Sequence, residues 1–239
     1  MPHSNEKPTR LALVGYGKMG RMVEQFAPEF GFEVGLTLDE FNNADGSGIS
    51  AGAFANIDVA IDFSIPSVVA GNAVSIAPLG VHIVIGTTGW LDRLPEVQAA
   101  VERENIGLVH GANFSVGVQV FYRIVETAAR VLAKEQDYDA WAYEIHHKMK
   151  KDAPSGTLLC LIDTMRASGY ERNIDAASNR AGAMPGRHEI GFDSETVTIQ
   201  ITHTARSRAG FARGALRAAR WITGKKGLYE FSSVWDQMS

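Results

Sequence analysis

The chain has 239 residues, of which 45% are hydrophobic and 21% are charged, and its formal net charge is −4. This composition excludes wholesale disorder, and the length fits one large or two modest globular domains. The acidic balance argues against a protein whose main partner is nucleic acid. Any anion-binding role must therefore come from local clusters of basic residues.

Two sequence features indicate where the protein works. No apolar run approaches the ~20 residues of a membrane-spanning helix, and the first ten residues lack the apolar core of a secretory signal. The single cysteine, Cys160, cannot form an internal disulfide, which fits a reducing compartment. Its neighbours in TLLCLI favour a buried, unreactive thiol. We therefore expect a cytoplasmic protein with no membrane partner.

The first half of the chain alternates between strand and helix patterns. Residues 10–39 predict a strand, a glycine turn, a helix and a second strand. Further strands are predicted over 58–64, 81–89 and 106–115, with a helix over 66–80. This alternation predicts right-handed βαβ units and a parallel sheet, so the fold class is α/β.

The pattern changes after Phe114, which we take as a domain boundary. The predicted elements are then a helix, a strand, a helix, a strand and a last helix, over 115–135, 138–147, 155–169, 195–205 and 214–231. The strand over 195–205 places Val197, Ile199 and Ile201 on one face. This half predicts an α+β domain with a mixed or antiparallel sheet.

A glycine turn, Gly15-x-Gly17-x-x-Gly20, lies between the first strand and the first helix, and Asp39 ends the next strand. Such a turn lets backbone N–H groups approach a pyrophosphate, and the acid can bind a ribose hydroxyl. A tight strand-to-helix turn alone would also explain the glycines. The strand, helix and acid in register favour dinucleotide binding, while Lys18 either pairs with phosphate or is solvated.

The ends of the other parallel strands should line the same crevice. They carry DFS (62–64), GTTG (86–89) and GANFS (111–115), which offer hydroxyls, an amide and close approach of the backbone. Ordinary capping of the following helices is the alternative explanation. We favour cofactor contact for these loops as a group.

The stretch EIHHKMKKDAPSGT, residues 144–157, is dense in titratable groups. If the strand continued, His146, Lys148 and Lys150 would share one face and His147 would point to the other. A metal site is not favoured, because histidines on opposite faces chelate poorly. No nucleic-acid module matches the chain. A solvated basic loop is the remaining plain alternative.

The chemistry of this stretch favours the acid/base and anion-binding centre of an enzyme. A helix that opens at Ser155 exposes free N–H groups, and Gly156 lets a carboxylate approach the backbone. Lys150 adds positive charge, and His146 is a proton carrier with an ordinary pKa near 6.5. A general acid beside an anion site suits the reduction of an acidic substrate by a nicotinamide nucleotide.

The same stretch resembles the signature E-x-H-H-x-x-K-x-D-A-P-S-G-T of the 4-hydroxy-tetrahydrodipicolinate reductase (dihydrodipicolinate reductase) family of the diaminopimelate and lysine pathway. The segments VGYGKMGRMV, DVAIDFS, VIGTTG and GANFSVGVQVF resemble its nucleotide turn, third strand, nicotinamide loop and crossing into the substrate domain. The resemblance covers most of the chain. It implies a Rossmann-like dinucleotide-binding domain over 1–114 and 212–239, and a substrate-binding and oligomerisation domain over 115–211.

The resemblance also implies roles for individual residues. His146 would be the general acid/base, and Lys150 a proton donor that neutralises a substrate carboxylate. The implied substrate-binding residues are His147, Ser155, Gly156 and Thr157. The expected cofactor-binding residues are Gly15, Tyr16, Gly17, Lys18, Met19, Gly20, Asp39, Gly86, Thr87, Thr88, Gly111, Ala112, Asn113 and Phe114. We expect no metal.

Departures from the family pattern bear on the cofactor and the assembly. Some members carry Arg after the acid at the end of the second strand, where it can hold the 2′-phosphate of NADP, but here that position is Glu40. NADH is therefore favoured over NADPH. The family is a homotetramer, and the shortened segment 166–180 leaves a dimer as the alternative. Competing functions are another NAD(P)-dependent dehydrogenase of a small dicarboxylate, or a non-catalytic nucleotide sensor.

Overall fold

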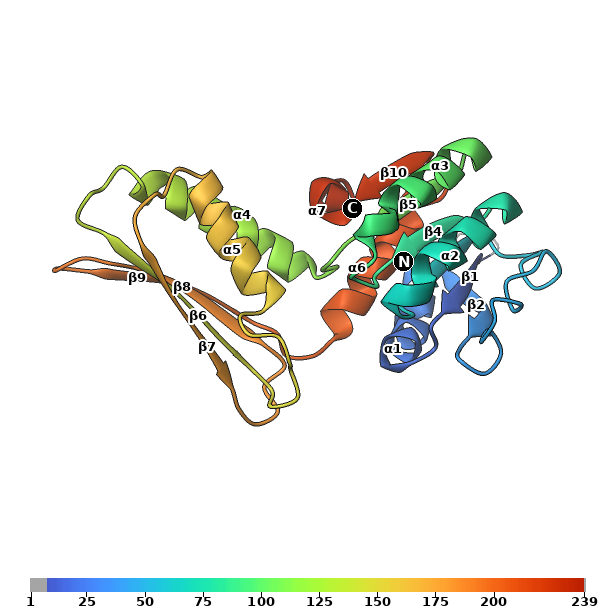
Figure 1. Ribbon diagram of the computed structural model, residues 1–239, viewed down its shortest axis with the longest axis horizontal. Helices are drawn as coiled ribbons and strands as arrows, with labels where there is room; N and C mark the ends of the chain where they lie inside the picture. The colour runs from blue at the N-terminus through green and yellow to red at the C-terminus, as the bar shows by residue number, and fades with distance from the viewer. Residues whose placement is uncertain (1–7, 239) are drawn as a thin grey trace. The chain divides into compact units, whose positions relative to one another are not determined.

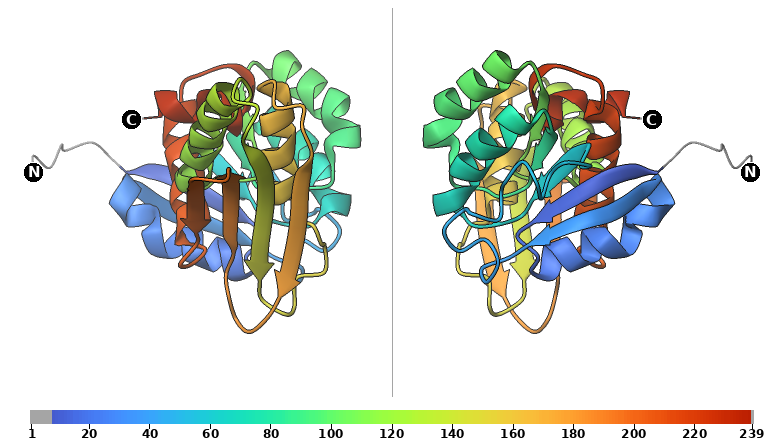
Figure 2. Two further views of the ribbon diagram at one scale, coloured as in Figure 1. Left: turned by 90° about the vertical axis from the view of Figure 1, so that its left-hand side faces the viewer. Right: turned by 90° about the vertical axis from the view of Figure 1, so that its right-hand side faces the viewer.

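The computed structural model describes residues 8–238. They form two compact units, drawn in Figures 1 and 2. The first consists of the described residues up to Ser115 together with those from Ala209 onward, and the second is Val116–Arg208. Each unit has its own sheet and its own hydrophobic core.

The first unit is built on a six-stranded sheet in which every pair of neighbouring strands is parallel. The strand order is β10-β5-β4-β3-β1-β2. The strands are β1 (Thr9–Val14), β2 (Phe32–Leu38), β3 (Val59–Asp62), β4 (His82–Ile85), β5 (Gly107–His110) and β10 (Gly227–Glu230). The short central strands β3 and β5 are buried at every residue, as expected of a parallel sheet covered on both faces. The predicted parallel sheet is confirmed.

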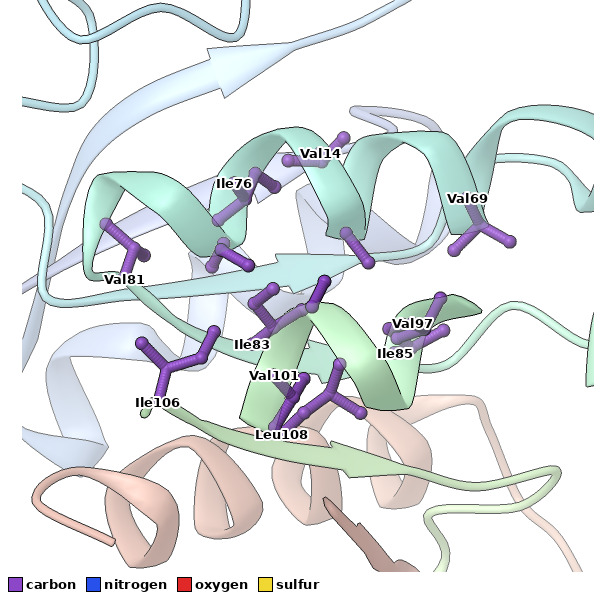
Figure 3. Close-up of a cluster of buried hydrophobic side chains, with 14 of the residues drawn as sticks. Val14, Val69, Ile76, Val81, Ile83, Ile85, Val97, Val101, Ile106 and Leu108 are labelled. Carbon is purple, nitrogen blue, oxygen red and sulfur yellow. The ribbon is translucent and has the colours of Figure 1, made fainter. Parts of the chain in front are cut away.

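Helices connect these strands and cover the sheet. They are α1 (Lys18–Phe26), α2 (Pro66–Ile76), α3 (Leu94–Glu104) and α6 (Ala209–Ile222), with single 3₁₀ turns at Ala27–Phe30, Ala77–Leu79 and Leu91–Arg93. Figure 3 shows Val69 and Ile76 of α2 and Val97 and Val101 of α3 packing into one cluster with Ile83 of β4. α1 packs against α6, which also contacts β3, β4 and β5.

The second unit has a mixed sheet of order β7-β6-β8-β9. Its strands are β6 (Asp139–His146), β7 (Ile174–Arg180), β8 (Arg187–Asp193) and β9 (Thr198–Thr204). β6 and β7 are parallel and the other pairs are antiparallel, so the predicted mixed sheet is confirmed. Helices α4 (Val116–Leu132) and α5 (Gly156–Ala167) pack on one face through residues such as Phe121 and Leu161. No helix among the described residues of this unit covers the other face (Figure 2).

Several expectations were wrong in detail. The predicted helix over 214–231 ends at Ile222, because Gly224 and Gly227 have φ of 80° and 101°, which a helix cannot continue through. The chain then forms β10, the helix α7 (Phe231–Val234) and a 3₁₀ turn at Trp235–Gln237. Helix α3 has no counterpart among the expected elements. Val197 precedes β9 and is 49% exposed, and Ile199 is 40% exposed, so of that expected face only Ile201 packs against the core.

The thiol of Cys160 is exposed on α5 rather than buried, which corrects the expectation drawn from its apolar neighbours. It interacts with the side chain of Tyr122 on α4. No helix of the described chain is long and apolar enough to cross a membrane.

Candidate active site

Strand β6 carries one acidic and one basic side chain, Glu144 and His146, on its buried face. Alternate residues of β6 are buried, ending with Glu144, which is fully buried, and His146, which is 7% exposed. The strand ends at His146, and a turn follows in which the Lys150 N–H donates to the His147 carbonyl at 3.0 Å. The sequence had predicted that Lys148 and Lys150 share a strand face with His146 if the strand continued. They do not, because the strand and its alternation end at His146.

Sheet register brings distant residues to Glu144 and His146. His188 on antiparallel β8 lies directly opposite Glu144, and Arg180 on parallel β7 lies opposite His146. These side chains meet on the same buried face of the sheet, since cross-strand partners point the same way. The imidazole rings of His146 and His188 lie edge to face with centroids 5.0 Å apart.

The Glu144 carboxylate is the centre of this cluster. Its Oε1 accepts hydrogen bonds from the Ser155 N–H and from the Arg180 guanidinium, both at 2.8 Å. Its Oε2 lies 3.3 Å from His146 Nδ1 and 3.4 Å from His188 Nε2. Burial opposes ionisation of Glu144, but the hydrogen bonds from Ser155 and Arg180 outweigh it and lower the pKa to about 2. The carboxylate is therefore ionised at neutral pH.

Both histidines of the cluster are held mainly neutral. Burial lowers the pKa of His188 to about 4, and the neighbouring His146 contributes to that shift. Burial also lowers the pKa of His146, while the charge of Glu144 opposes that shift. A neutral His146 next to an ionised carboxylate can take up a proton and release it at small cost, which is the behaviour of a general acid/base.

Helix α5 begins beside the cluster. The Ser155 hydroxyl caps it by accepting from the Leu158 N–H at 3.2 Å and lies 3.1 Å from His188 Nε2. The backbone and hydroxyl of Ser155 are thus both engaged within the chain. Beside Gly156, no atom of the described chain lies within 4 Å of the place a Cβ would take. No side chain at Gly156 covers the start of the helix, where the N–H groups of the first turn have no helical partner, and such a helix start suits an anion.

Lys150 stands at the rim of this site. Its ammonium forms a 2.9 Å ion pair with Asp152, whose main-chain carbonyl accepts from Arg180. That ion pair, with burial opposing it, lowers the pKa of Asp152. Asp152 therefore holds Lys150 in place and shares Arg180 with Glu144.

One atom each of Glu144, His146 and His188 lies within 4.8 Å of the others, a spacing that divalent metals also use. The Arg180 guanidinium already neutralises Glu144, and the Lys150 ammonium adds a second positive charge beside His146. This charge balance opposes a bound cation. The absence of a metal stays a prediction.

In the glycine turn of the first unit, Gly15 and Gly20 are tightly packed, whereas the space beside Gly17 is empty. A Cβ on Gly15, which has φ of 84°, would lie 2.5 Å from the backbone of Phe63, and one on Gly20 would lie 2.8 Å from the Gly15 carbonyl. Beside Gly17, the N-cap of α1, a Cβ would meet no described atom within 4 Å. No side chain among the described residues caps α1. The N–H groups of Gly15, Tyr16 and Gly17 are bonded within the chain, so a pyrophosphate would be held by the uncapped first turn of α1, next to the empty space at Gly17.

The residues around that turn are placed as follows. Lys18 is exposed and Met19 half-buried on the first turn of α1, and the Tyr16 hydroxyl donates to Glu24 on the same helix. Asp39 directly follows β2, and its Oδ1 accepts from the Phe41 and Asn42 N–H groups at 2.9 and 3.2 Å. The Gly15 and Tyr16 N–H groups both donate to the Leu38 carbonyl, which fixes the turn to the end of β2.

The loop after β4 is organised by a buried acid. Asp62, 1% exposed, accepts from the Ser64 N–H and the Asn72 amide at 2.7 and 2.9 Å, and the Thr87 hydroxyl lies 3.5 Å away. Burial raises the pKa of Asp62. A Cβ on Gly86 would collide with the Phe63 ring, so packing alone requires that glycine. Thr88 is exposed in the same loop.

In the loop after β5, main-chain groups are better placed than side chains to contact a ligand. Phe114 is 2% exposed and packs on Phe231 with ring centroids 4.5 Å apart, and a Cβ on Gly111 would lie 2.8 Å from Phe231. Ala112 is exposed, and the Asn113 side chain accepts from the Ser115 N–H at 2.9 Å. Any ligand contact from Phe114 would have to come from its main chain.

Comparison with known proteins agrees with this arrangement. The family model described as dihydrodipicolinate reductase, N-terminus, matches residues 9–114, and the one described as dihydrodipicolinate reductase, C-terminus, matches residues 117–235. The 4-hydroxy-tetrahydrodipicolinate reductase of Christiangramia forsetii is 33% identical over 240 residues, covering 95% of this chain and 98% of the relative. The chain belongs to the dihydrodipicolinate reductase family.

Two further matches support membership of this family. The 4-hydroxy-tetrahydrodipicolinate reductase of Chromohalobacter salexigens is 37% identical over 266 residues, covering 95% of this chain and 98% of the relative. A solved structure, the dipicolinate-bound dihydrodipicolinate reductase from Paenisporosarcina sp. TG-14, superposes with a TM-score of 0.78 at 21% identity, covering 95% of this chain and 99% of that chain. At that identity the superposition supports the fold.

Sequence reasoning missed several residues of this dihydrodipicolinate reductase site. Arg180 and His188 lie 36 and 44 positions after Glu144 and reach it only through strand register. Glu144 was given no role beyond being the first residue of the stretch 144–157. The acid of DFS, Asp62, was visible as a strand end, but its burial was not. An alternating strand that places a lone acid among apolar residues is the one signal that could have marked Glu144.

Proposed function

We propose that this chain catalyses the NAD(P)H-dependent reduction of 4-hydroxy-tetrahydrodipicolinate to tetrahydrodipicolinate in the diaminopimelate branch of lysine biosynthesis. The observation that carries the proposal is the arrangement at the end of β6. There His146 lies beside an ionised, fully buried Glu144, and the same carboxylate holds the start of α5 through the Ser155 N–H. A proton donor and an anion site are thereby fixed to each other.

The second unit would bind the dicarboxylate. The open N–H groups at Gly156 and Thr157 and the Lys150 ammonium supply hydrogen bonds and positive charge for its carboxylates. His147 directly follows the end of β6, and its carbonyl accepts from the Lys150 N–H, so the two residues share one turn and we assign His147 a substrate contact. We assign Ser155 a supporting role, because its N–H and hydroxyl are already engaged.

The chemistry assigned to this chain's residues is proton delivery and orientation. A nicotinamide nucleotide, when bound, supplies the hydride. His146 donates a proton to the carbon next to the one that is reduced, and the N–H bond breaks as the C–H bond forms. The substrate loses its hydroxyl group as water before this reduction. Lys150 offsets the negative charge of a carboxylate and assists the proton transfer.

The first unit would hold the nucleotide. Gly15, Tyr16, Gly17, Lys18, Met19 and Gly20 form the pyrophosphate turn, and the loops Gly86–Thr88 and Gly111–Phe114 contribute at neighbouring strand ends. Residues 39–47 contain three acids and no lysine or arginine. A 2′-phosphate beside Asp39 would meet negative charge, so we propose that NADH is preferred over NADPH.

We also propose a homotetramer that assembles through the helix-free face of the second unit's sheet. That face presents Trp141, Tyr143, Arg187 and Glu189 around a shallow hollow. Aromatic side chains and arginine are typical of protein interfaces. Light scattering on the purified protein should give the mass of four chains, whereas a dimer or monomer would contradict the assembly.

The activity is tested by following oxidation of NADH or NADPH with the product formed from aspartate semialdehyde and pyruvate. Turnover with either nucleotide supports the proposal, and kcat/KM should be higher with NADH. A lack of turnover with both would refute it and favour a dehydrogenase of another small dicarboxylate. Higher kcat/KM with NADPH would overturn only the cofactor preference.

A further inference from the structure

We propose that Glu144 is a positioning residue that fixes the protonation state of His146, so that Nε2 is the atom that exchanges a proton with substrate. This inference rests on the proposed function, in which His146 delivers the proton. Glu144 itself touches neither substrate nor cofactor in this proposal. It acts through the His146 ring and through the start of α5.

The two oxygens of Glu144 have separate tasks. Oε1 is occupied by the Ser155 N–H and the Arg180 guanidinium. Oε2 is buried, makes no hydrogen bond to any described residue, and lies 3.3 Å from His146 Nδ1, which is likewise buried without a hydrogen bond. Hydrogen bonds of catalytic groups are often long in a free enzyme and tighten in the complex. His188 Nε2 lies 3.4 Å from the same oxygen but only 3.1 Å from the Ser155 hydroxyl, so the nearer partner of that nitrogen is Ser155. The geometry thus makes His146 the partner that Oε2 is placed to hold.

Hydrogen-bond chemistry then fixes the tautomer. An ionised carboxylate only accepts hydrogen bonds, so the ring nitrogen that faces it must carry hydrogen. Neutral His146 therefore keeps its proton on Nδ1, and Nε2 has the free lone pair. The imidazolium forms when Nε2 takes a proton, and it is stabilised by the charge on Glu144. Glu144 stays ionised while the proton passes from Nε2 to the substrate.

The surroundings of Nε2 agree with this assignment. Gly186, just before β8, lies beside that edge of the ring, and a Cβ there would be only 2.9 Å from Nε2. Because this position is glycine, a side chain does not cover Nε2. Nδ1 is enclosed by Glu144 and Nε2 is bordered by a residue with no side chain.

The charges around His146 decide the sign of the expected pH effect. Besides Glu144, the groups that face it are Lys150 and Asp152 from the following loop, Arg180 from β7 and His188 from β8. Lys150 and Arg180 disfavour the imidazolium, and Glu144 is the nearest group that favours it. Without the charge on Glu144, protonation of His146 becomes harder, so the pKa of the catalytic acid falls.

The test is Glu144→Gln, which keeps size and an acceptor oxygen for Ser155 but puts an N–H donor in front of Nδ1. We expect kcat to fall about 10- to 100-fold, a part of the effect of losing a general acid. We expect the basic limb of the kcat profile to move about one pH unit lower. KM for the dicarboxylate should stay within about threefold of the wild-type value, because the N–H groups of the anion site at Gly156 and Thr157 are unchanged.

The matched control is Glu126→Gln. Glu126 is also ion-paired, with Arg130, but it lies on the exposed side of helix α4 and has no assigned role. The basic limb of the kcat profile of this variant should coincide with that of the wild type. An unchanged kcat and pH profile in Glu144→Gln would overturn the inference, as would an equal shift in Glu126→Gln, because loss of any carboxylate charge from the second unit would then suffice.

A measurement on the unmodified protein covers the case in which Glu144→Gln does not fold. Nitrogen-15 NMR of the histidine rings should show neutral His146 with hydrogen on Nδ1, and hydrogen on Nε2 would contradict the inference. This readout needs no turnover. If the wild type fails to oxidise either nucleotide, the proposed function fails, while the tautomer still decides the role of Glu144.

Discussion

His146 and Lys150 are the two residues whose loss should reduce catalysis most. Removing a general acid typically costs about 10²- to 10⁴-fold in rate, so we expect kcat losses in that range for His146→Gln and for Lys150→Ala. The matched control is Lys151→Ala, since Lys151 is exposed in the same loop and has no assigned role. Steady-state kinetics with NADH decides the matter. Near-normal kcat in both site variants would refute the assigned roles.

Gly186 offers a second test at the residue scale, because it pairs with a natural control. Gly186→Ala places a Cβ 2.9 Å from His146 Nε2, whereas Gly182→Ala, in the same β7–β8 connection, meets no described atom within 4 Å. Both glycines have positive φ, at 153° and 56°, so both variants carry backbone strain. We expect both to lose stability but only Gly186→Ala to lose kcat, by about tenfold or more. Equal kcat in the two variants would contradict the prediction that a Cβ at position 186 displaces or blocks the His146 ring.

Local spacing explains why some site residues could be identified from the sequence. His146, Lys150 and the start of α5 lie within eleven residues of chain, so their proximity follows from one strand, one turn and one helix start. Arg180 and His188 could not be assigned, since a shift of one residue in strand register would turn them to the other face. The expected alternation through Lys150 failed because the strand ends at His146.

Among the elements, helix α4 depends on a cap supplied from far along the chain. The Arg172 guanidinium donates to the main-chain carbonyls of Leu132, Ala133 and Glu135 and to that of Tyr138, and it stacks over the Tyr170 ring at 4.4 Å. Arg172→Ala removes the shared donor, although the Tyr138 carbonyl keeps the Tyr170 hydroxyl and the Leu132 carbonyl keeps the Glu135 N–H. We expect a loss of about 2 kcal/mol in the free energy of unfolding of the second unit.

Arg130→Ala is the control for that prediction. Arg130 lies near the same end of α4 but forms only an exposed ion pair with Glu126, which is worth less than about 0.5 kcal/mol. Urea unfolding of both variants, followed by circular dichroism, measures the difference. If the two variants lose the same stability, the carbonyl cap formed by Arg172 contributes nothing beyond a surface charge.

Elements with strong periodicity were predictable and those defined by long-range pairing were not. β1, β3, β4 and β5 are apolar runs that need no partner to be identified. β10 has three half-buried residues and one exposed residue and forms a strand because it pairs with β5, which is distant in sequence. The glycines before it were the available signal, and the helix prediction that ran through them overlooked their positive φ.

At the scale of the whole molecule, buried and half-buried histidines make stability depend on pH. Burial lowers the pKa of His82 and His110 in the first unit and of His146, His188 and His203 in the second. In the unfolded chain these rings take up protons near pH 6.5, while the folded chain resists protonation to lower pH, about 4 for His188. Below pH 6.5 the unfolded state therefore binds more protons, and acidification favours unfolding.

Glu144 extends this effect to lower pH, because its folded pKa of about 2 lies below the ordinary 4.5. Its contribution to stability is present above pH 4.5 and is lost as the pH falls toward 2. We therefore expect the free energy of unfolding to fall steadily from pH 7 to 4 and further below, at up to about 1.4 kcal/mol per pH unit for each proton taken up, and the urea midpoint to fall with it. In His188→Gln the fall between pH 6.5 and 4 should be shallower, relative to that variant's own stability at pH 7. A wild-type midpoint that stays constant from pH 7 to 5 would contradict the assignment of buried, neutral histidines.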